Sequence, residues 1–134
     1  MLRPRPNRTY APRNRNTTFA SMLTITTGDR PMTVINVFTV APAQQRRLVE
    51  LLTQATESSI RHVPGFVSAA LHRSLDGTKV TMYAQWATPE HYDRMRARPD
   101  ASPFLAEALA IARFDPGFYE VVGVFAPDAS RPVV

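Results

Sequence analysis

The sequence predicts an α+β domain of the ferredoxin-like type, in which helices cover one face of an antiparallel sheet. Apolar side chains alternate along several short segments, which is typical of strands, and recur at helical spacing in the segments between them. These segments follow one another in the order β-α-β-β-α-β, which is the split βαβ layout. The 134 residues are enough for one domain with one core.

The first strand and the first helix are expected at the start of this domain. Residues 32 to 40, MTVINVFTV, are rich in β-branched and aromatic side chains, and Asn36 is the one strongly polar residue among them. Pro42 is expected to open a helix, because apolar residues follow it at helical spacing: Leu48, Leu51, Leu52 and Ala55. Residues 63 to 65, Val-Pro-Gly, end this helix, and residues 66 to 75 form the second strand.

The next strand brings the only tryptophan of the chain to the start of a helix. From residue 80 to residue 86, apolar side chains occupy alternate positions, and Trp86 is the last of them. Thr88 is suited to cap a helix that begins at Pro89, because the fixed backbone and the missing N–H of proline fit the first helical position. Trp86 is therefore expected where this strand gives way to the helix.

The last third of the chain predicts one more helix and one more strand. The short helix ends near Arg98-Pro99, and Ser102-Pro103 has the composition of a cap and a first helical position. Pro116-Gly117 is expected to break the second helix, and residues 118 to 125, FYEVVGVF, read as the final strand.

The domain is expected to span residues 32 to 126, followed by a tail at 127 to 134. Residues 1 to 31 hold six arginines against one aspartate, and they carry the whole net charge of +5. A basic, proline-containing segment without periodic apolar residues is predicted to be disordered. An upstream start codon that extends the chain is the preferred interpretation, and a transit peptide or an RNA-binding arm is the alternative. Because the rest of the chain is neutral, no nucleic-acid partner is expected.

Composition excludes several kinds of site. The chain has no cysteine, so disulfides, thiolate metal sites and cysteine nucleophiles are excluded. No apolar run approaches the roughly 18 residues of a membrane span, and we expect a cytoplasmic protein without a membrane partner. The three histidines lack ligand spacing and no glycine-rich phosphate loop occurs, so neither a metal nor a nucleotide cofactor is expected.

The predicted sheet has a second face that the helices of one chain are too few to cover. In the second strand, apolar side chains fall on both faces, as in Phe66, Val67, Ala69, Ala70 and Leu71. A second copy of the chain, packed sheet against sheet, is the economical way to bury that face. We therefore expect a homodimer.

The hairpin at Asp76-Gly77 decides which residues share a face with Trp86. If these two residues alone form the turn, Leu71 lies opposite Met82 and His72 points to the other face. If Leu75 belongs to a three-residue turn, Phe66 lies opposite Trp86 and His72 shares the tryptophan face. The second register is favoured, because Gly77 suits a bulge position.

Three runs together resemble one protein family: VPGF at 63 to 66, LDGT at 75 to 78 and YAQW at 83 to 86. They are similar to the antibiotic biosynthesis monooxygenase family, over residues 34 to 125, and most of all to the small anthrone oxygenases of aromatic polyketide pathways. The resemblance implies a dimeric α+β barrel that oxidises phenolic polycycles to quinones with O2, with no cofactor and O2 as co-substrate.

Residue by residue, the resemblance implies four catalytic positions. Trp86 corresponds to the pocket tryptophan, Tyr92 to the tyrosine six positions later, His72 to the histidine before the hairpin turn, and Asn36 to a first-strand asparagine of one branch. Two family positions differ here, because an expected asparagine is Met82 and an expected arginine on the later helix is Ala106.

The chemistry itself asks little of the protein. A deprotonated, electron-rich phenol or anthrone can pass an electron to O2, so the pocket need only orient it, stabilise the anion and exclude water. Asn36 is expected to donate to a developing oxyanion, and Tyr92 or His72 to move a proton. Residues expected to contact a small aromatic substrate are Phe66, Met82 and Phe38.

Three other functions remain open on the sequence. One is oxygenation of a small quinol, and another is haem degradation, although the histidine which that reaction needs on the helix after Trp86 would fall near Arg96. The third is a noncatalytic, dimeric small-molecule-binding protein, which the departures at Met82 and Ala106 would allow.

Overall fold

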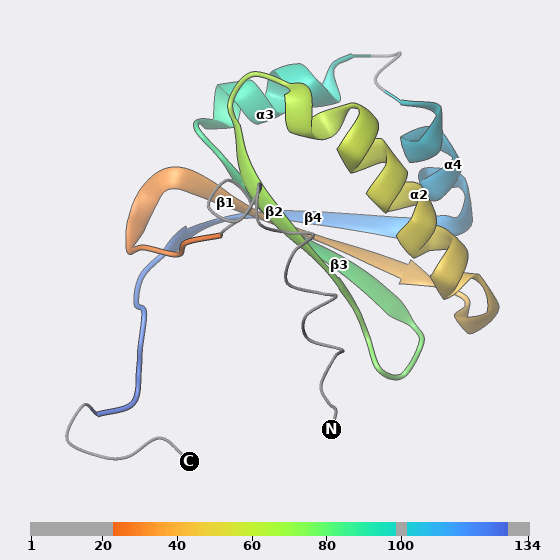
Figure 1. The fold of residues 1–134 in the computed structure, drawn as a ribbon, viewed down its shortest axis with the longest axis horizontal. Coiled ribbons are helices and arrows are strands. Elements are labelled where there is room, and N and C mark those ends of the chain that lie inside the picture. The colour runs from red at the N-terminus through yellow and green to blue at the C-terminus, as the bar shows by residue number, and fades with distance from the viewer. Residues whose placement is uncertain (1–22, 99–101, 129–134) are drawn as a thin grey trace, which may run out of the picture.

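The computed structural model describes residues 23–98 and 102–128, and these form one sheet with helices on one side. The four antiparallel strands lie in the order β2-β3-β1-β4. Figure 1 shows the helices α2, α3 and α4 together above one face of this sheet, and none of the described residues forms a helix on the other face. The predicted ferredoxin-like α+β class is confirmed.

The elements follow the predicted order along the chain. Strands are β1 (Gly28–Val40), β2 (Phe66–Arg73), β3 (Lys79–Trp86) and β4 (Ala112–Val121). Helices are α2 (Gln45–Ser58), α3 (Pro89–Arg96) and α4 (Pro103–Ile111), with short 3-10 turns at Pro42–Gln44 and Ile60–His62. None of the helices in the described residues is long and apolar enough to cross a membrane.

Two of the three predicted helix starts are confirmed, and each uses a hydroxyl cap before a proline; at Pro42 a 3-10 turn comes first and α2 begins at Gln45. The Thr88 side chain accepts a hydrogen bond from the backbone N–H of His91, and Pro89 occupies the first position of α3. The Ser102 side chain likewise accepts from the N–H groups of Phe104 and Leu105 at the start of α4. These caps fix the points at which the chain turns onto the face of the sheet.

The bounds predicted for the outer strands are wrong in two places. Strand β1 begins at Gly28, so residues 28 to 31 belong to the sheet and not to a disordered extension. Strand β4 runs through Pro116 and Gly117, which were expected to precede it, and it ends at Val121 rather than at residue 125. A proline is tolerated there because β4 is an edge strand with one side free of partners. Residues 1–22 and 129–134 lie outside the described part.

The favoured register of the β2–β3 hairpin is also wrong. Leu71 pairs with Met82 and His72 with Thr81, so His72 is exposed on the face opposite to Trp86. Phe66 nevertheless pairs with Trp86, because the register shifts by one residue at Val67. The pairing expected for a two-residue turn therefore holds next to the turn, and the pairing of Phe66 with Trp86 expected for a three-residue turn holds at the far end of the hairpin. Gly77, with φ of +84°, provides the left-handed residue that the loop needs.

The core between helices and sheet has two ends of different composition. One end, here called the aromatic end, is made of Met32, Val34, Met82, Ala84, Trp86, Tyr92 and Met95. The other, here called the aliphatic end, is made of Phe38, Val40, Leu48, Leu51, Leu52, Val80 and Ala108. The aliphatic end lies under α2 and α4, and the aromatic end lies under α3.

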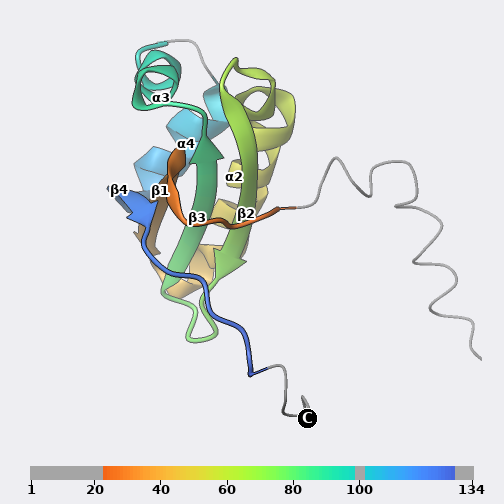
Figure 2. The ribbon, with the colours of Figure 1, turned by 90° about the vertical axis from the view of Figure 1, so that its left-hand side faces the viewer.

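The face of the sheet without helices carries a polar patch that the start of the described chain crosses. Ser68 donates a hydrogen bond of 2.6 Å to the Gln85 side chain, which in turn donates to the carbonyl of Thr24 at 2.8 Å. Figure 2 shows this segment, in orange, passing in front of β3 and β2. The Tyr83 hydroxyl on the same face is buried without a hydrogen-bond partner.

Candidate active site

A cavity lies between the sheet and the helices, where the two ends of the core meet. Its lining comes from β1, β2, β3, β4 and all three helices: Asn36, Phe38, Leu52, Thr56, Ile60, Phe66, Ala69, Met82, Ala84, Trp86, Tyr92, Met95, Arg96, Leu105 and Phe114. The cavity volume is about 50 Å³, well below that of a typical ligand pocket. A flat ring system therefore requires side chains to move, and the flexible Met82 and Met95 are suited to do so.

Aromatic rings packed edge to face form the wall at the aromatic end. Phe66 lies 5.4 Å from Trp86, Trp86 lies 5.8 Å from Tyr92, and Tyr92 lies 5.2 Å from Phe118, all measured between ring centroids. Each pair is close to perpendicular, which is a favoured arrangement for aromatic rings. Trp86 is only 1% exposed, so its indole is held firmly at the end of β3.

Four polar residues line this largely apolar cavity, Asn36, Thr56, Tyr92 and Arg96, and two of them lie side by side. Asn36 projects from β1 on the helix face, and its buried Oδ1 accepts no hydrogen bond. Burial raises the pKa of the Tyr92 hydroxyl, and the nearby charge of Asp93 adds to the rise, while the positive charge of Arg96 and a hydrogen bond with Asn36 oppose it. Tyr92 is therefore a neutral hydrogen-bond donor at physiological pH, with Asn36 beside it.

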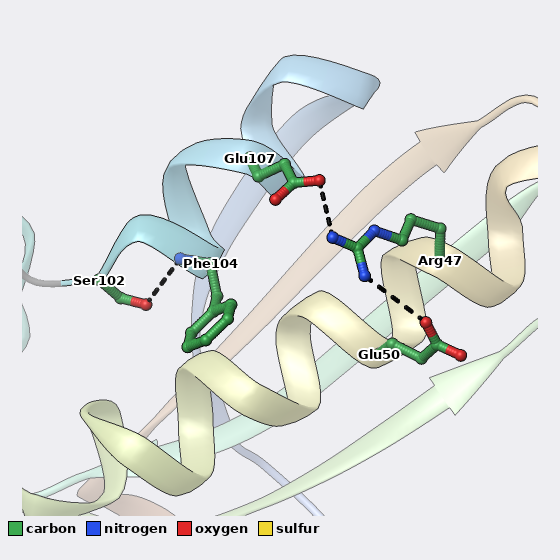
Figure 3. A network of polar contacts seen from close by, with 5 residues as sticks. All are labelled: Arg47, Glu50, Ser102, Phe104 and Glu107. Atoms are coloured by element: carbon green, nitrogen blue, oxygen red, sulfur yellow. Dashed lines mark hydrogen bonds and ion pairs between the residues drawn. The ribbon is translucent and has the colours of Figure 1, made fainter.

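The helices that roof the cavity are tied together at their outer surface. Figure 3 shows Arg47 of α2 between Glu107 of α4 and Glu50 of its own helix, with nitrogen–oxygen distances of 2.8 and 3.7 Å. These groups are about half exposed, so their attraction adds little to stability. The ring of Phe104 points from α4 toward α2 and is partly buried against the aliphatic end.

Residues 31–107 match the family model described as antibiotic biosynthesis monooxygenase. The chain belongs to this family. The family predicted from the three sequence runs is thus confirmed, and the protein is an enzyme of the monooxygenase class.

Two relatives of this monooxygenase share enough sequence to be informative. It is 43% identical to the tetracenomycin-F1 monooxygenase of Streptomyces glaucescens, over 78% of this chain and 93% of that protein. It is 34% identical to the ActVA-Orf6 monooxygenase of Streptomyces coelicolor, whose structure holds the ligand nanaomycin D. That structural match has a TM-score of 0.58 and covers 74% of this chain and 94% of the other.

A third match supports the fold alone. The cofactor-independent oxygenase SnoaB from Streptomyces nogalater is 24% identical to this monooxygenase, with a TM-score of 0.60 over 72% of this chain and 97% of that one.

The cavity of this monooxygenase brings together six of the seven residues that the sequence singled out: Asn36, Phe38, Phe66, Met82, Trp86 and Tyr92. The seventh, His72, does not line it, because the hairpin register turns that side chain to the other face. Ala106, where an arginine was expected, is exposed on α4 and does not line the cavity either. Among the described residues no cluster of three potential metal ligands occurs.

His91 has a structural role at the start of α3. Its Nδ1 lies 2.7 Å from the Thr88 hydroxyl, and its ring packs directly against Gly65, where a Cβ atom would overlap it. Gly65 also has φ of +92°, so a side chain there would be both strained and obstructed. His91 thereby holds the start of α3 against the loop that precedes β2.

The sequence reasoning missed one lining residue of chemical interest, Arg96. It follows Tyr92 by four residues, so it lies one helical turn farther along the same face of α3. This four-residue spacing was the sequence signal that could have identified Arg96 as a lining residue. The approach of Phe114, which completes this side of the cavity, could not be read from it, because it depends on how α3 packs over β4.

Proposed function

We propose that this protein is a cofactor-independent monooxygenase that oxidises a polycyclic aromatic phenol or anthrone to a quinone with O2, in the biosynthesis of a polyketide antibiotic. The observation that carries the proposal is the cavity, in which an aromatic wall faces only a few polar groups, and two of these, Asn36 and Tyr92, lie side by side. The names of the two closer relatives, a tetracenomycin monooxygenase and a monooxygenase with nanaomycin D bound, point to the same substrate class.

The proposed reaction needs no electron source besides the substrate. The anthrone loses a proton from its CH₂ group, and the resulting carbanion gives one electron to O2. The radical pair joins to form a C–O bond, and the peroxide anion takes up one proton, which balances the proton lost in the first step. The hydroperoxide then loses water, with the second hydrogen of the CH₂ carbon, which breaks the O–O bond and leaves a carbonyl. One oxygen atom of O2 enters the quinone and the other leaves as water. The CH₂ carbon supplies all four electrons.

Asn36 and Tyr92 have complementary roles in this scheme. The Asn36 amide donates a hydrogen bond to the oxyanion of the ionised substrate, and its free Oδ1 can accept one from a substrate hydroxyl. Tyr92, which stays protonated, donates a hydrogen bond to the peroxide oxygen that leaves as water. Trp86 and Phe66 hold the rings in place, and the apolar lining excludes bulk water.

The haem-degrading alternative lacks a suitable ligand in the described part of the chain. No histidine is among the residues that line the cavity, and His91 is engaged with Thr88 and Gly65.

The proposal is tested by incubating the purified full-length protein with an anthrone under air and following quinone formation by absorbance. We expect turnover far above the spontaneous oxidation, unchanged by a chelator and without added flavin. With ¹⁸O2, one labelled atom should appear in the quinone and the other in water. Turnover at the background rate, or only after a flavin or a metal is added, would show that the proposal is wrong.

We further propose that the protein acts as a homodimer joined through the face of the sheet that carries no helices. Nine large apolar side chains are exposed in the described chain, and four of them lie near the end of β4 and in the segment after it: Tyr119, Val122, Val124 and Phe125. Such a concentration is typical of an interaction surface.

Sedimentation velocity tests the assembly directly. We expect a dimer at micromolar concentration, and a monomer for the double variant Val124→Asp, Phe125→Asp, because two charges cannot be buried in such an interface. A monomer for the unaltered chain would rule this proposal out.

A further inference from the structure

One charged side chain lines the cavity. Of the lining residues, Arg96 is the only one with a charge, and no carboxylate stands among them to neutralise it. Its position is at the end of α3, one turn after Tyr92, whose pKa the positive charge of Arg96 lowers against the effect of burial. The cation therefore acts on the same space as the polar pair Asn36 and Tyr92.

The guanidinium of Arg96 is held in place by stacking and not by an ion pair. Its central carbon lies 4.9 Å from the ring centroid of Phe114. Within residues 23–98 and 102–128 it forms no salt bridge, even though Asp93 lies three positions earlier on the same helix. Stacking uses the face of the guanidinium and leaves the N–H groups at its edge free to donate.

We propose that Arg96 is the anion-binding residue of this pocket and selects polycyclic aromatic substrates that carry an ionised oxygen at the edge of the rings. The proposal deepens the proposed function, on which it rests for the identity of the site. An aromatic ring system fills the apolar part of the cavity, and its negative oxygen is placed at the mouth, against the edge of the guanidinium. A planar cation with parallel N–H donors matches a carboxylate, and it also stabilises a phenolate.

The anion has two possible sources, and both would use the same contact. It is either a carboxylate carried by the substrate or the phenolate that forms when the substrate ionises before it meets O2. In the second case Arg96 would also promote the reaction, because it stabilises the ionised form of the substrate. A set of redox-inert probes separates these sources from each other and from simple ring binding.

The experiment measures binding to the full-length protein through the fluorescence of Trp86, which is the only tryptophan of the chain and lies in the cavity wall. Three anthraquinones are titrated: the 2-carboxylate, the neutral 2-carboxamide and a 1,2-dihydroxy form, the last below and above the pKa of its phenol. We expect the carboxylate, the phenolate or both to bind more tightly than the amide. The anion that binds more tightly than the amide is then identified as the group that the pocket recognises.

The test variant is Arg96→Gln, and Arg94→Gln is the matched control on the same helix, because Arg94 is exposed, as Arg96 is, but does not line this cavity. Arg96→Gln should weaken binding of the favoured anion by about tenfold or more and change binding of the amide by less than twofold. Arg94→Gln should change neither. Arg96→Lys keeps the charge without the planar edge and should fall between the two.

The outcomes separate this inference from the proposed function. Equal affinity of the unaltered protein for anions and amide, or equal weakening of both by Arg96→Gln, overturns the role of Arg96 and leaves the oxygenase proposal standing. If no probe quenches Trp86, both proposals fail together. If anion selectivity depends on Arg96 but no anthrone is oxidised, the anion site stands and the proposed reaction is wrong.

Discussion

The two ends of the core are built from the same sheet and yet are suited to different tasks. The aliphatic end holds three leucines of α2 at 0 to 2% exposure, packed against β-branched residues of β1 and β3. The aromatic end holds three methionines, Met32, Met82 and Met95, with Trp86 and Tyr92, and the last two methionines line the cavity. Leucine packing fixes a single arrangement, whereas methionine adapts to what it contacts. Stability and ligand binding are therefore expected to depend on different ends.

The largest effect is expected at the aliphatic end. Leu51 is fully buried, so Leu51→Ala should lower the free energy of unfolding by about 2 to 5 kcal/mol, because it leaves a cavity that the rigid surroundings cannot fill. Turnover per folded molecule should be unchanged, since Leu51 does not line the cavity. Urea unfolding and steady-state kinetics measure the two quantities. A fall in turnover equal to that of a cavity variant would break the division between the ends.

At the aromatic end the expected change is in turnover. Trp86→Phe keeps an aromatic ring but removes part of the wall, so turnover should fall by roughly tenfold or more as the substrate loses its position. The loss of stability should be smaller than for Leu51→Ala, because one side of the indole already faces the cavity. If stability drops by several kcal/mol while turnover survives, Trp86 belongs to the core alone.

Tyr92→Phe removes one hydroxyl with almost no change of volume, and its effects should be smaller. Turnover should fall several-fold at neutral pH, where Tyr92 is protonated. Because burial raises its pKa in the folded state, the unfolded chain ionises first, and stability present below about pH 10 is lost as pH rises through the folded-state pKa. The difference in unfolding midpoint between the two proteins at pH 9 and at pH 11 measures this. An equal loss in both would mean that Tyr92 does not contribute.

The smallest effect is expected in the β2–β3 loop, beside the start of α2. Hydrogen bonds from Thr78 and Ser74 hold the pKa of Asp76 at about 2. Its contribution to stability is present above the unfolded-state pKa and is lost as pH falls through the folded-state pKa, in the window from about 4 to 2. Asp76→Asn should flatten thermal stability across that window and leave binding in the cavity unchanged. A pH profile identical to that of the unaltered protein would contradict this.

Much of the fold could be predicted from residues that lie close together in the sequence. The caps at Thr88 and Ser102 were predictable, because a hydroxyl before a proline acts within one helical turn. The strand through Pro116 was not predictable, because its tolerance depends on β4 being an edge, which is a property of the whole sheet. The register at His72 failed because Gly77 suits loops of different length, so the turn residues alone did not determine the pairing next to the turn.

The candidate site likewise has features that could be predicted from the sequence and one that could not. Asn36, Trp86 and Tyr92 could be expected to meet because they lie on facing strands and on the helix that follows directly. The stacking of Arg96 on Phe114 could not, because it depends on the approach of α3 to a strand that comes much later in the chain.

The bulge at Val67 also determines where strand β2 can lose a residue without disturbing its pairing with β3. One residue there has no partner on β3, while the pairs on both sides of it keep their faces. Loss of Val67 would leave Phe66 opposite Trp86 and Leu71 opposite Met82, in an unbroken ladder. Loss of Ala69 or Ala70 would instead turn one part of β2 over and move its apolar residues out of the core. A one-residue deletion in this strand is therefore expected to be tolerated at Val67 and selected against at its neighbours.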